Sequence, residues 1–421
     1  MILFVELIGV GRLVCSSGMW ILTYFVVNVI TPIISDMIYQ PATTSIHIGI
    51  TGFALGMNVC LLMPQFRYKK SGNFLYHKPD LLKYAEIRRF LFIILIAALV
   101  MYYGLSGLLA LFFGNNTMTT IINAGGISFW GHLVTILIEV FTYFNALILI
   151  FDSKENMKEN AIWLIFSYGL QALCSYARAP VIYTAGIIIV YYMRKKKPER
   201  QALIAIPTLV IGIFAMVILI FFRNYGIGNT ILNLGKYITQ KSVWMNISDY
   251  LDFPAGYTYF VDLLKNGENI RVNYMAIFKP LFILIPRSLW AGKPNYLTVE
   301  ILSQLHPELY KAGFSTGFGL LGEAHALMGN IGCFIIPFVT GVVCTILDNK
   351  FIYLVRNGID NNLWTWFYLM FTVVILITNA RGGLVDSYTS WMFPTIFSLF
   401  IGILPRIAWR KQHVRIRLKK T

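Results

Sequence analysis

The chain has 421 residues, of which 57% are hydrophobic and only 13% are charged, and its mean hydropathy is +0.66. Soluble domains carry about 25% charged residues, so this composition excludes an ordinary soluble fold. Apolar runs of roughly 20 residues recur instead, and they predict an all-α polytopic integral membrane protein. A transmembrane β-barrel is excluded as well, because its strands would alternate in polarity, whereas residues 202–222 are apolar almost throughout.

The net charge of +16 at pH 7 would suit a nucleic-acid partner, but the basic residues stand in short segments between the apolar runs. Lys and Arg in such segments hold them on the cytoplasmic side, so we predict no nucleic-acid partner. The 5 cysteines lie mostly inside apolar runs without a CxxC pair, and we expect them to pack as small side chains. Residues 1–14 lack the basic start of a signal peptide and are expected to lie partly buried or at the membrane interface.

In chain order, the sequence predicts about ten spans with both termini in the cytoplasm. They are expected at residues 18–35, 46–63, 90–113, 131–151, 161–176, 181–193, 202–222, 323–347, 363–379 and 388–404. The chain then forms a single membrane domain over residues 1–421, with the earlier spans in 18–222 and the later spans in 323–404. Between them, residues 223–322 form a large external loop, and residues 405–421 form a basic cytoplasmic tail.

The distribution of basic residues carries this topology. The short segments expected inside hold 24 Lys and Arg residues, whereas the short segments expected outside hold 2. The other 9 lie in the loop 223–322, which is too long to be a topology signal. Within it, residues 275–286 (MAIFKPLFILIP) are apolar but too short to span, and they include Lys279 and Pro280. We expect a re-entrant or interfacial element there, which is tolerated where protein covers it.

Four arginines are expected at the outer ends of apolar segments, near one plane: Arg178, Arg223, Arg287 and Arg381. Planar guanidinium groups bind the oxygens of a diphosphate bidentately. A diphosphate site is therefore the functional interpretation. The alternative for each arginine is snorkelling to the lipid headgroups.

Glu323 and His325 stand at the outer entrance of the span expected at 323–347, and each is a candidate general base toward a sugar hydroxyl. Two positions on a regular helix differ by about 200°, so the two side chains do not face one point. One then faces a cavity and the other a packing partner, unless the nearby glycines keep the segment irregular. The alternative for each is a hydrogen-bonded structural role.

Further candidates are a buried carboxylate and the aromatic external loop. Glu139 lies near the middle of the span expected at 131–151, where a carboxylate marks either a functional site, such as a proton or cation relay, or a neutral or paired structural group. In the loop, Trp290, Lys293 and Tyr296 stand close together. Aromatic rings among polar groups suit carbohydrate, and packing of a small helical cap is the alternative.

The chain resembles the bacterial oligosaccharide repeat-unit polymerases of the O-antigen (Wzy) type. The resemblance covers the whole chain in layout, with a large outer loop between late spans. At the level of residues it is carried by IPRSLWAGKP at 285–294, by STGFGLLGEAHALMGNIG at 315–332 and, less closely, by YARAPVIYTAG at 176–186. The chain departs from the family at Ala291–Gly292, where a polar pair is common, so no role is assigned to that turn.

The resemblance implies a fold of the multi-span membrane glycosyltransferase (GT-C-like) class shared with O-antigen ligases, in the bacterial inner membrane with its active site facing the periplasm. Undecaprenyl-diphosphate oligosaccharides would be donor and acceptor in the synthesis of lipopolysaccharide O-antigen or a related polysaccharide, with a chain-length regulator as a further partner. The four arginines would hold the diphosphate, Glu323 or His325 would deprotonate the acceptor, and Trp290, Lys293 and Tyr296 would help to place sugars. The sequence has no metal-ligand spacing and no Walker or dinucleotide motif, so we expect transfer without a metal or cofactor. Direct attack of the acceptor hydroxyl on the anomeric carbon would proceed most simply with inversion.

Three alternatives remain open. An O-antigen ligase belongs to the same class. A flippase for lipid-linked oligosaccharides would show repeated halves and no dominant outer loop. An ion-coupled transporter would depend on Glu139.

Overall fold

Every regular element in the described part of the computed structural model is a helix. The structure describes residues 15–34, 38–62, 81–113, 129–152, 156–174, 179–197, 200–201, 203–204, 207, 215, 218–219, 221–222, 227–239, 253–267, 270–282, 285, 289–311, 317–375, 383 and 396. The lead-in at 1–14 and the tail at 405–421 therefore lie outside the described residues, as do most of the predicted spans at 202–222 and 388–404.

The long helices follow the predicted apolar runs, with ends that differ by a few residues. They are α2 (Ser16–Phe25) with the π-helical η1 (Val26–Ile30) and α3 (Thr31–Ile34), then α4 (Gln40–Leu62), α5 (Leu81–Phe113), α7 (Phe129–Phe151), α8 (Met157–Cys174), α9 (Ala179–Met193), α18 (Gly319–Arg356), and α19 (Leu363–Met370) with the π-helical η6 (Phe371–Ile375). Within α5, α7 and α18, the segments Tyr84–Phe112, Leu133–Phe151 and Gly319–Arg356 are long and apolar enough to cross a membrane. Length and composition thus favour an integral membrane protein.

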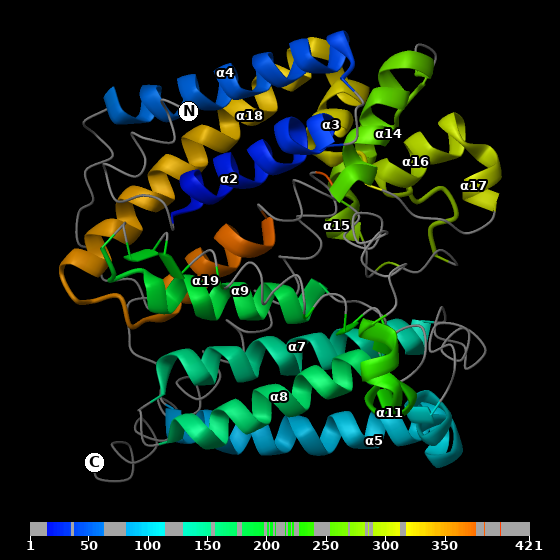
Figure 1. Cartoon of the computed structure of the whole chain (residues 1–421), viewed down its shortest axis with the longest axis vertical. Coiled ribbons are helices and arrows are strands. Elements are labelled where there is room, and N and C mark those ends of the chain that lie inside the picture. Colours follow the sequence, from blue (N-terminus) through cyan, green and yellow to red (C-terminus); the bar gives the residue numbers. More distant parts are fainter. Residues whose placement is uncertain are drawn as a thin grey trace, which may run out of the picture.

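These helices form two groups that lie roughly parallel (Figure 1). One group contains α2, α4 and α18, and the other contains α5, α7 and α8, while α9 and α19 lie between the two groups. Within the first group, glycines allow close approach: a Cβ atom on Gly52 or Gly56 of α4 would overlap the backbone of Phe334 or Phe338 in α18. Small residues at such a crossing are typical of helices that pack in membranes.

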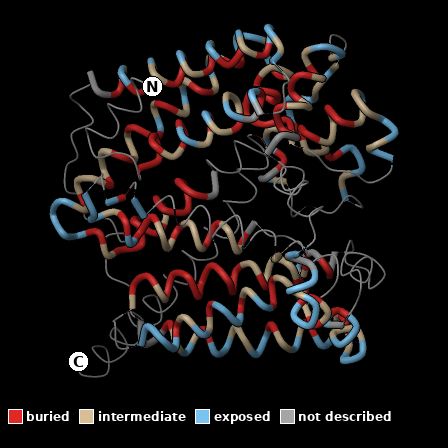
Figure 2. Tube along the Cα trace, in the orientation of Figure 1, coloured by how far each residue is buried: buried red, intermediate tan, exposed pale blue. Residues whose placement is uncertain are grey.

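Burial separates a central helix from a peripheral one. In the apolar stretch of α7, 72% of the residues are buried, whereas in that of α5 only 11% are buried. Figure 2 shows this contrast along the two helices. The exposed side chains of α5 are large and apolar, such as Met101 and Leu105. The burial contrast places α7 at the core of its group and α5 at the edge. An exposed apolar surface such as that of α5 suits lipid better than water.

The described helices of the segment 223–322, which is predicted to be an external loop, gather at one end of the long helices (Figure 1). They are α11 (Ile227–Ile238), α14 (Phe253–Asn266), the 3-10 helix η5 (Tyr274–Phe278), α15 (Lys279–Phe282), α16 (Leu297–Leu305) and α17 (Pro307–Lys311). Of these, α14 packs against α3, η1, α4 and the start of α18. The loop therefore covers the end of the bundle at which α18 begins.

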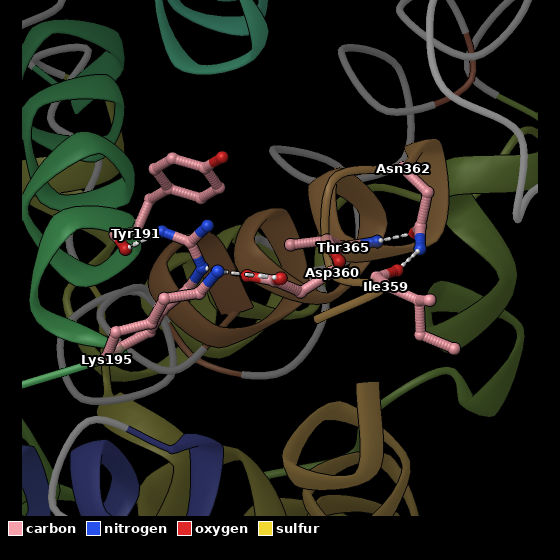
Figure 3. Close-up of polar contacts among 7 residues, drawn as sticks. Tyr191, Lys195, Ile359, Asp360, Asn362 and Thr365 are labelled. Atoms are coloured by element: carbon pink, nitrogen blue, oxygen red, sulfur yellow. Dashed lines mark hydrogen bonds and ion pairs between the residues drawn. The ribbon is translucent and has the colours of Figure 1, made fainter. Parts of the chain in front are cut away.

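Ion pairs connect several segments at the opposite end. Arg88 pairs with Glu159 at 2.7 Å, and Asp360 accepts from Arg194 at 2.5 Å and from Lys195 at 3.0 Å. Figure 3 shows Lys195 and Asp360 turned toward one another, beside the turn that begins α19. Each of these contacts joins two segments that were both predicted to lie on the cytoplasmic side. Which side of the membrane this end faces stays a prediction.

Asp348 forms a buried polar centre at the same end. Its carboxylate accepts the backbone N–H groups of Ser16 at 2.9 Å and Ser17 at 3.1 Å and both of their hydroxyls at 2.5 Å. The hydroxyl of Tyr368 donates to it as well, at 2.7 Å. Because Cys15 provides no side-chain cap, α18 supplies the N-terminal cap of α2.

Candidate functional site

The helix that carries Glu323 and His325 is broken just after them. Met328 and Gly329 have non-helical backbone angles within α18, and Gly329 has φ 60° and ψ −145°. This region of backbone conformation is open to glycine and strained for other residues. The segment before the break, residues 319–327, is therefore a short helix of its own.

The short helix folds back against the helix that follows. Cys333 Sγ lies 3.7 Å from the carbonyl oxygen of Leu321, although 12 residues of straight helix would separate the two by about 18 Å. A Cβ atom on Gly332 would overlap the carbonyl group of Ala324. The helix extends beyond the predicted span 323–347 at both ends, from Gly319 to Arg356, and its first residues belong to the folded-back segment.

Glu323 is fully buried and lies against Gly383, a residue far along the sequence. Its side chain is 0% exposed, and a Cβ atom on Gly383 would overlap its carboxyl group. Gly383 has φ 94°, so a glycine is required there both by the backbone angle and by the close approach. The short helix thereby places a carboxylate in contact with the segment that follows Arg381 and Gly382.

His325 faces a different neighbourhood. It lines a cavity of 230 Å³ between the short helix and the C-terminal part of α14, together with Leu263, Leu264, Gly267, Ile270 and Ala326. The ring packs edge-on toward Phe260, with centroids 6.4 Å apart. Its Nδ1 atom is buried without a hydrogen-bond partner among the described residues, which is unusual for a buried polar atom.

The two candidate bases are thus separated, as the helical spacing predicted. Glu323 meets the loop at Gly383, and His325 lines the cavity beneath α14. One of them contacts a packing partner and the other a cavity.

The four arginines of the predicted diphosphate site lie outside the described residues: Arg178, Arg223, Arg287 and Arg381. Their convergence stays a prediction. In the sequence, Arg381 stands two residues before Gly383, which contacts Glu323, and Arg178 directly precedes Ala179, at which α9 begins.

The predicted sugar-binding residues of the loop each contact another residue of the loop. The amine of Lys293 is buried and donates to the carbonyl of Ile285 at 2.7 Å. Trp290 packs edge-on against Phe282, with centroids 5.1 Å apart, and the ring of Tyr296 lies 5.2 Å from the amine of Lys279. In this arrangement the three side chains stabilise the loop, and their contact with sugar stays a prediction.

A histidine that the sequence analysis did not single out joins two helices of the loop. His306 Nε2 contacts the carboxylate of Asp262 on α14, and its Nδ1 lies 3.3 Å from Glu308 on α17. Asn266 donates to the other oxygen of Asp262 at 2.6 Å. The sequence offers little signal for this cluster, because Asp262 and His306 are 44 residues apart and only the fold brings them together.

Glu139 lies within α7 and is partly buried. Among the described residues, no group of three or more His, Cys, Asp or Glu side chains is placed to hold a metal ion, and the expectation of metal-independent chemistry stays a prediction.

The chain matches none of the known family models, none of the curated proteins and none of the solved structures with which it was compared.

Proposed function

We propose that this protein is a membrane glycosyltransferase that polymerises oligosaccharide repeat units carried on undecaprenyl diphosphate, at the periplasmic face of a bacterial inner membrane. The observation that carries the proposal is the position of Glu323. A fully buried carboxylate stands on a short folded-back helix, at the end of the bundle covered by the external loop, and contacts Gly383. A buried carboxylate in a membrane helix is costly, and function is the usual reason for keeping one.

In the proposed reaction, Glu323 accepts the proton of an acceptor sugar hydroxyl. The hydroxyl oxygen attacks the anomeric carbon of the donor, the bond from that carbon to the phosphate oxygen breaks, and the lipid diphosphate leaves with the bonding electrons. Arginine side chains stabilise the charge that develops on the diphosphate. Arg381 is the first candidate for this role, since it stands two residues before Gly383.

His325 is the second candidate base. Its cavity of 230 Å³ is close to the lower limit of ordinary ligand pockets, and it suits a sugar unit at the end of an acceptor chain. The imidazole of His325 would then either take the proton or position the hydroxyl. A separate test of Glu323 and His325 assigns the two roles.

The first experiment compares Glu323→Gln with Glu308→Gln in a strain that lacks the chromosomal gene. Glu308 lies in the same loop region and its side chain is 68% exposed, so it controls for the change of charge. With equal amounts of protein in the membrane, we expect Glu323→Gln to reduce the surface polysaccharide to single repeat units and Glu308→Gln to keep the full ladder. Full-length polymer from Glu323→Gln would exclude Glu323 as the base, and full-length polymer from a His325→Ala variant as well would refute the proposal.

The phenotype of the deletion strain separates the alternatives. Single repeat units attached to the lipid anchor indicate a polymerase, unattached polymer indicates a ligase, and lipid-linked units held on the cytoplasmic side indicate a flippase. Uptake that fails in Glu139→Gln but survives in Glu323→Gln would instead indicate an ion-coupled transporter.

A second pair of variants tests the contact between Glu323 and Gly383. Both Gly383 and Gly358 have positive φ, at 94° and 66°, but a Cβ atom on Gly358 would meet nothing within 4 Å. Backbone strain is therefore common to Gly383→Ala and Gly358→Ala, and only the former displaces the carboxylate. We expect polymer to be lost in Gly383→Ala alone.

A further inference from the structure

In the loop segment 274–296, which we call the arch, several large apolar side chains of the described residues are turned outward. It contains η5, α15 and the turns that lead to α16. The exposed fraction is 62% for Tyr274, 50% for Phe278, 66% for Leu281 and 80% for Leu289. Large apolar side chains exposed in this density over so short a segment are unusual for a surface in contact with water.

The two lysines of the arch, which lie among the described residues, are turned inward. Lys279 and Lys293 are only 5% and 8% exposed. The amine of Lys279 donates to the carbonyl of Pro294 at 2.7 Å, and the amine of Lys293 donates to the carbonyl of Ile285 at 2.7 Å. A lysine at a protein–water surface usually extends its amine into solvent, so the arrangement is the reverse of the one that water favours.

The arch is attached to α18 at the top of an apolar stripe. The hydroxyl of Tyr274 donates to the carbonyl of Leu327 at 3.2 Å. From the next residue onward, one face of α18 exposes large apolar side chains at helical spacing: Met328, Ile331, Ile335, Val339 and Val343. The exposed surface of the arch therefore continues an exposed stripe on a helix that is long and apolar enough to cross a membrane.

We propose that the arch is immersed in one leaflet of the lipid bilayer, with Phe278, Leu281 and Leu289 among the acyl chains. The inward lysines satisfy the backbone carbonyls that the turns expose, which is necessary where no water is present to do so. The outward side chains contact hydrocarbon in place of water, which is favourable for apolar groups. The stripe on α18 indicates that lipid covers the arch. The two exposed surfaces are continuous, so a bilayer that covers the stripe also reaches the arch.

Immersion of the arch gives the His325 cavity a definite surrounding. Ile270 and Ala326 line the cavity, and they stand close in sequence to the two residues of the attachment, Tyr274 and Leu327. The cavity therefore lies near the point at which the arch is attached to α18. The immersion does not depend on the reaction that the protein catalyses, so it is tested separately from the proposed function.

The test places a nitroxide label on single cysteines in the protein reconstituted in phosphatidylcholine nanodiscs. Positions 278, 281 and 289 lie on the arch, position 331 on α18 is the lipid reference, and the exposed Gln304 and Glu308 give the aqueous reference at positions 304 and 308. The native cysteines Cys15, Cys60, Cys174, Cys333 and Cys344 are all buried, and unsubstituted protein carried through the labelling reports their background. Collision with oxygen, which concentrates in hydrocarbon, is compared with collision with a water-soluble nickel chelate.

We expect labels at 278, 281 and 289 to resemble the label at 331, with oxygen collisions favoured severalfold over nickel relative to positions 304 and 308. Nickel-dominated collisions at the arch would show that water covers it and would overturn the proposal. Protection from both agents would overturn it too, since protein would then cover the surface. All label positions have exposed side chains, so the folded protein is expected to tolerate them.

Discussion

Asp348 illustrates how a single charge is retained inside this protein. The carboxylate is 0% exposed, and burial of an unpaired charge is strongly unfavourable. Here its two oxygens accept from Ser16, Ser17 and Tyr368. It also lies at the N-terminus of α2, where the helix dipole favours a negative charge. The residue is therefore a structural anchor and not a candidate for the reaction.

Replacement of Asp348 by alanine should destabilise the protein by about 3 kcal/mol, because it removes several charge-assisted hydrogen bonds and leaves buried donors without a partner. Thermal unfolding in detergent measures the change. The matched control is Glu308→Ala, a carboxylate that is 68% exposed and should shift stability by less than about 0.5 kcal/mol. Equal unfolding temperatures for the two variants would contradict the anchoring role.

At the scale of the element, α18 shows what the sequence can and cannot predict. The apolar run at 323–347 correctly predicts a helix, and the polar residues at its entrance mark Glu323 and His325 as unusual. The break is less predictable, because one glycine within a helical pattern is tolerated and only the positive φ of Gly329 identifies it. The neighbours of Glu323 could not be predicted either, since Gly383 lies far along the chain.

Gly329→Ala should loosen the folded-back helix, because alanine is strained by about 1–3 kcal/mol in that backbone conformation although its Cβ has open space. The thiol of Cys333, which lies against Leu321, should then react faster with N-ethylmaleimide. Cys344 is equally buried in the same helix, beyond the break, and serves as the control. Mass spectrometry identifies the modified peptide. Unchanged labelling of Cys333, or equal acceleration at Cys344, would contradict a local opening.

At the scale of the whole molecule, the two ends of the bundle differ in what holds them together. One end is covered by the helices of the external loop, whereas ion pairs connect segments at the other (Figure 3). The sequence predicted that the segments at 194–201 and 348–362 share a side, from their basic residues. It could not predict that Asp360 pairs with Arg194, because the partners are 166 residues apart.

The strength of this connection is measurable. Asp360→Asn leaves the guanidinium of Arg194, which is only 8% exposed, without its charge partner, and this should cost about 3–5 kcal/mol. Lys195 is the other partner of Asp360, and its side chain is 53% exposed. Lys195→Met should therefore lower the free energy of unfolding by less than about 1 kcal/mol. Thermal unfolding in detergent compares the two variants. An equal loss of stability would show that the buried pair contributes no more than the exposed one.

The cap that Asp348 supplies to α2 also has a consequence for the order of biosynthesis. The chain is made and inserted from its N-terminus, yet the first turn of α2 is completed by a residue that follows 332 positions later. During synthesis the earliest described helix therefore enters the membrane with its terminal N–H groups uncapped by Asp348. In a ribosome-bound chain that ends before α18, the amide hydrogens of the first turn of α2 should exchange rapidly. In the complete, released chain their exchange should be slow.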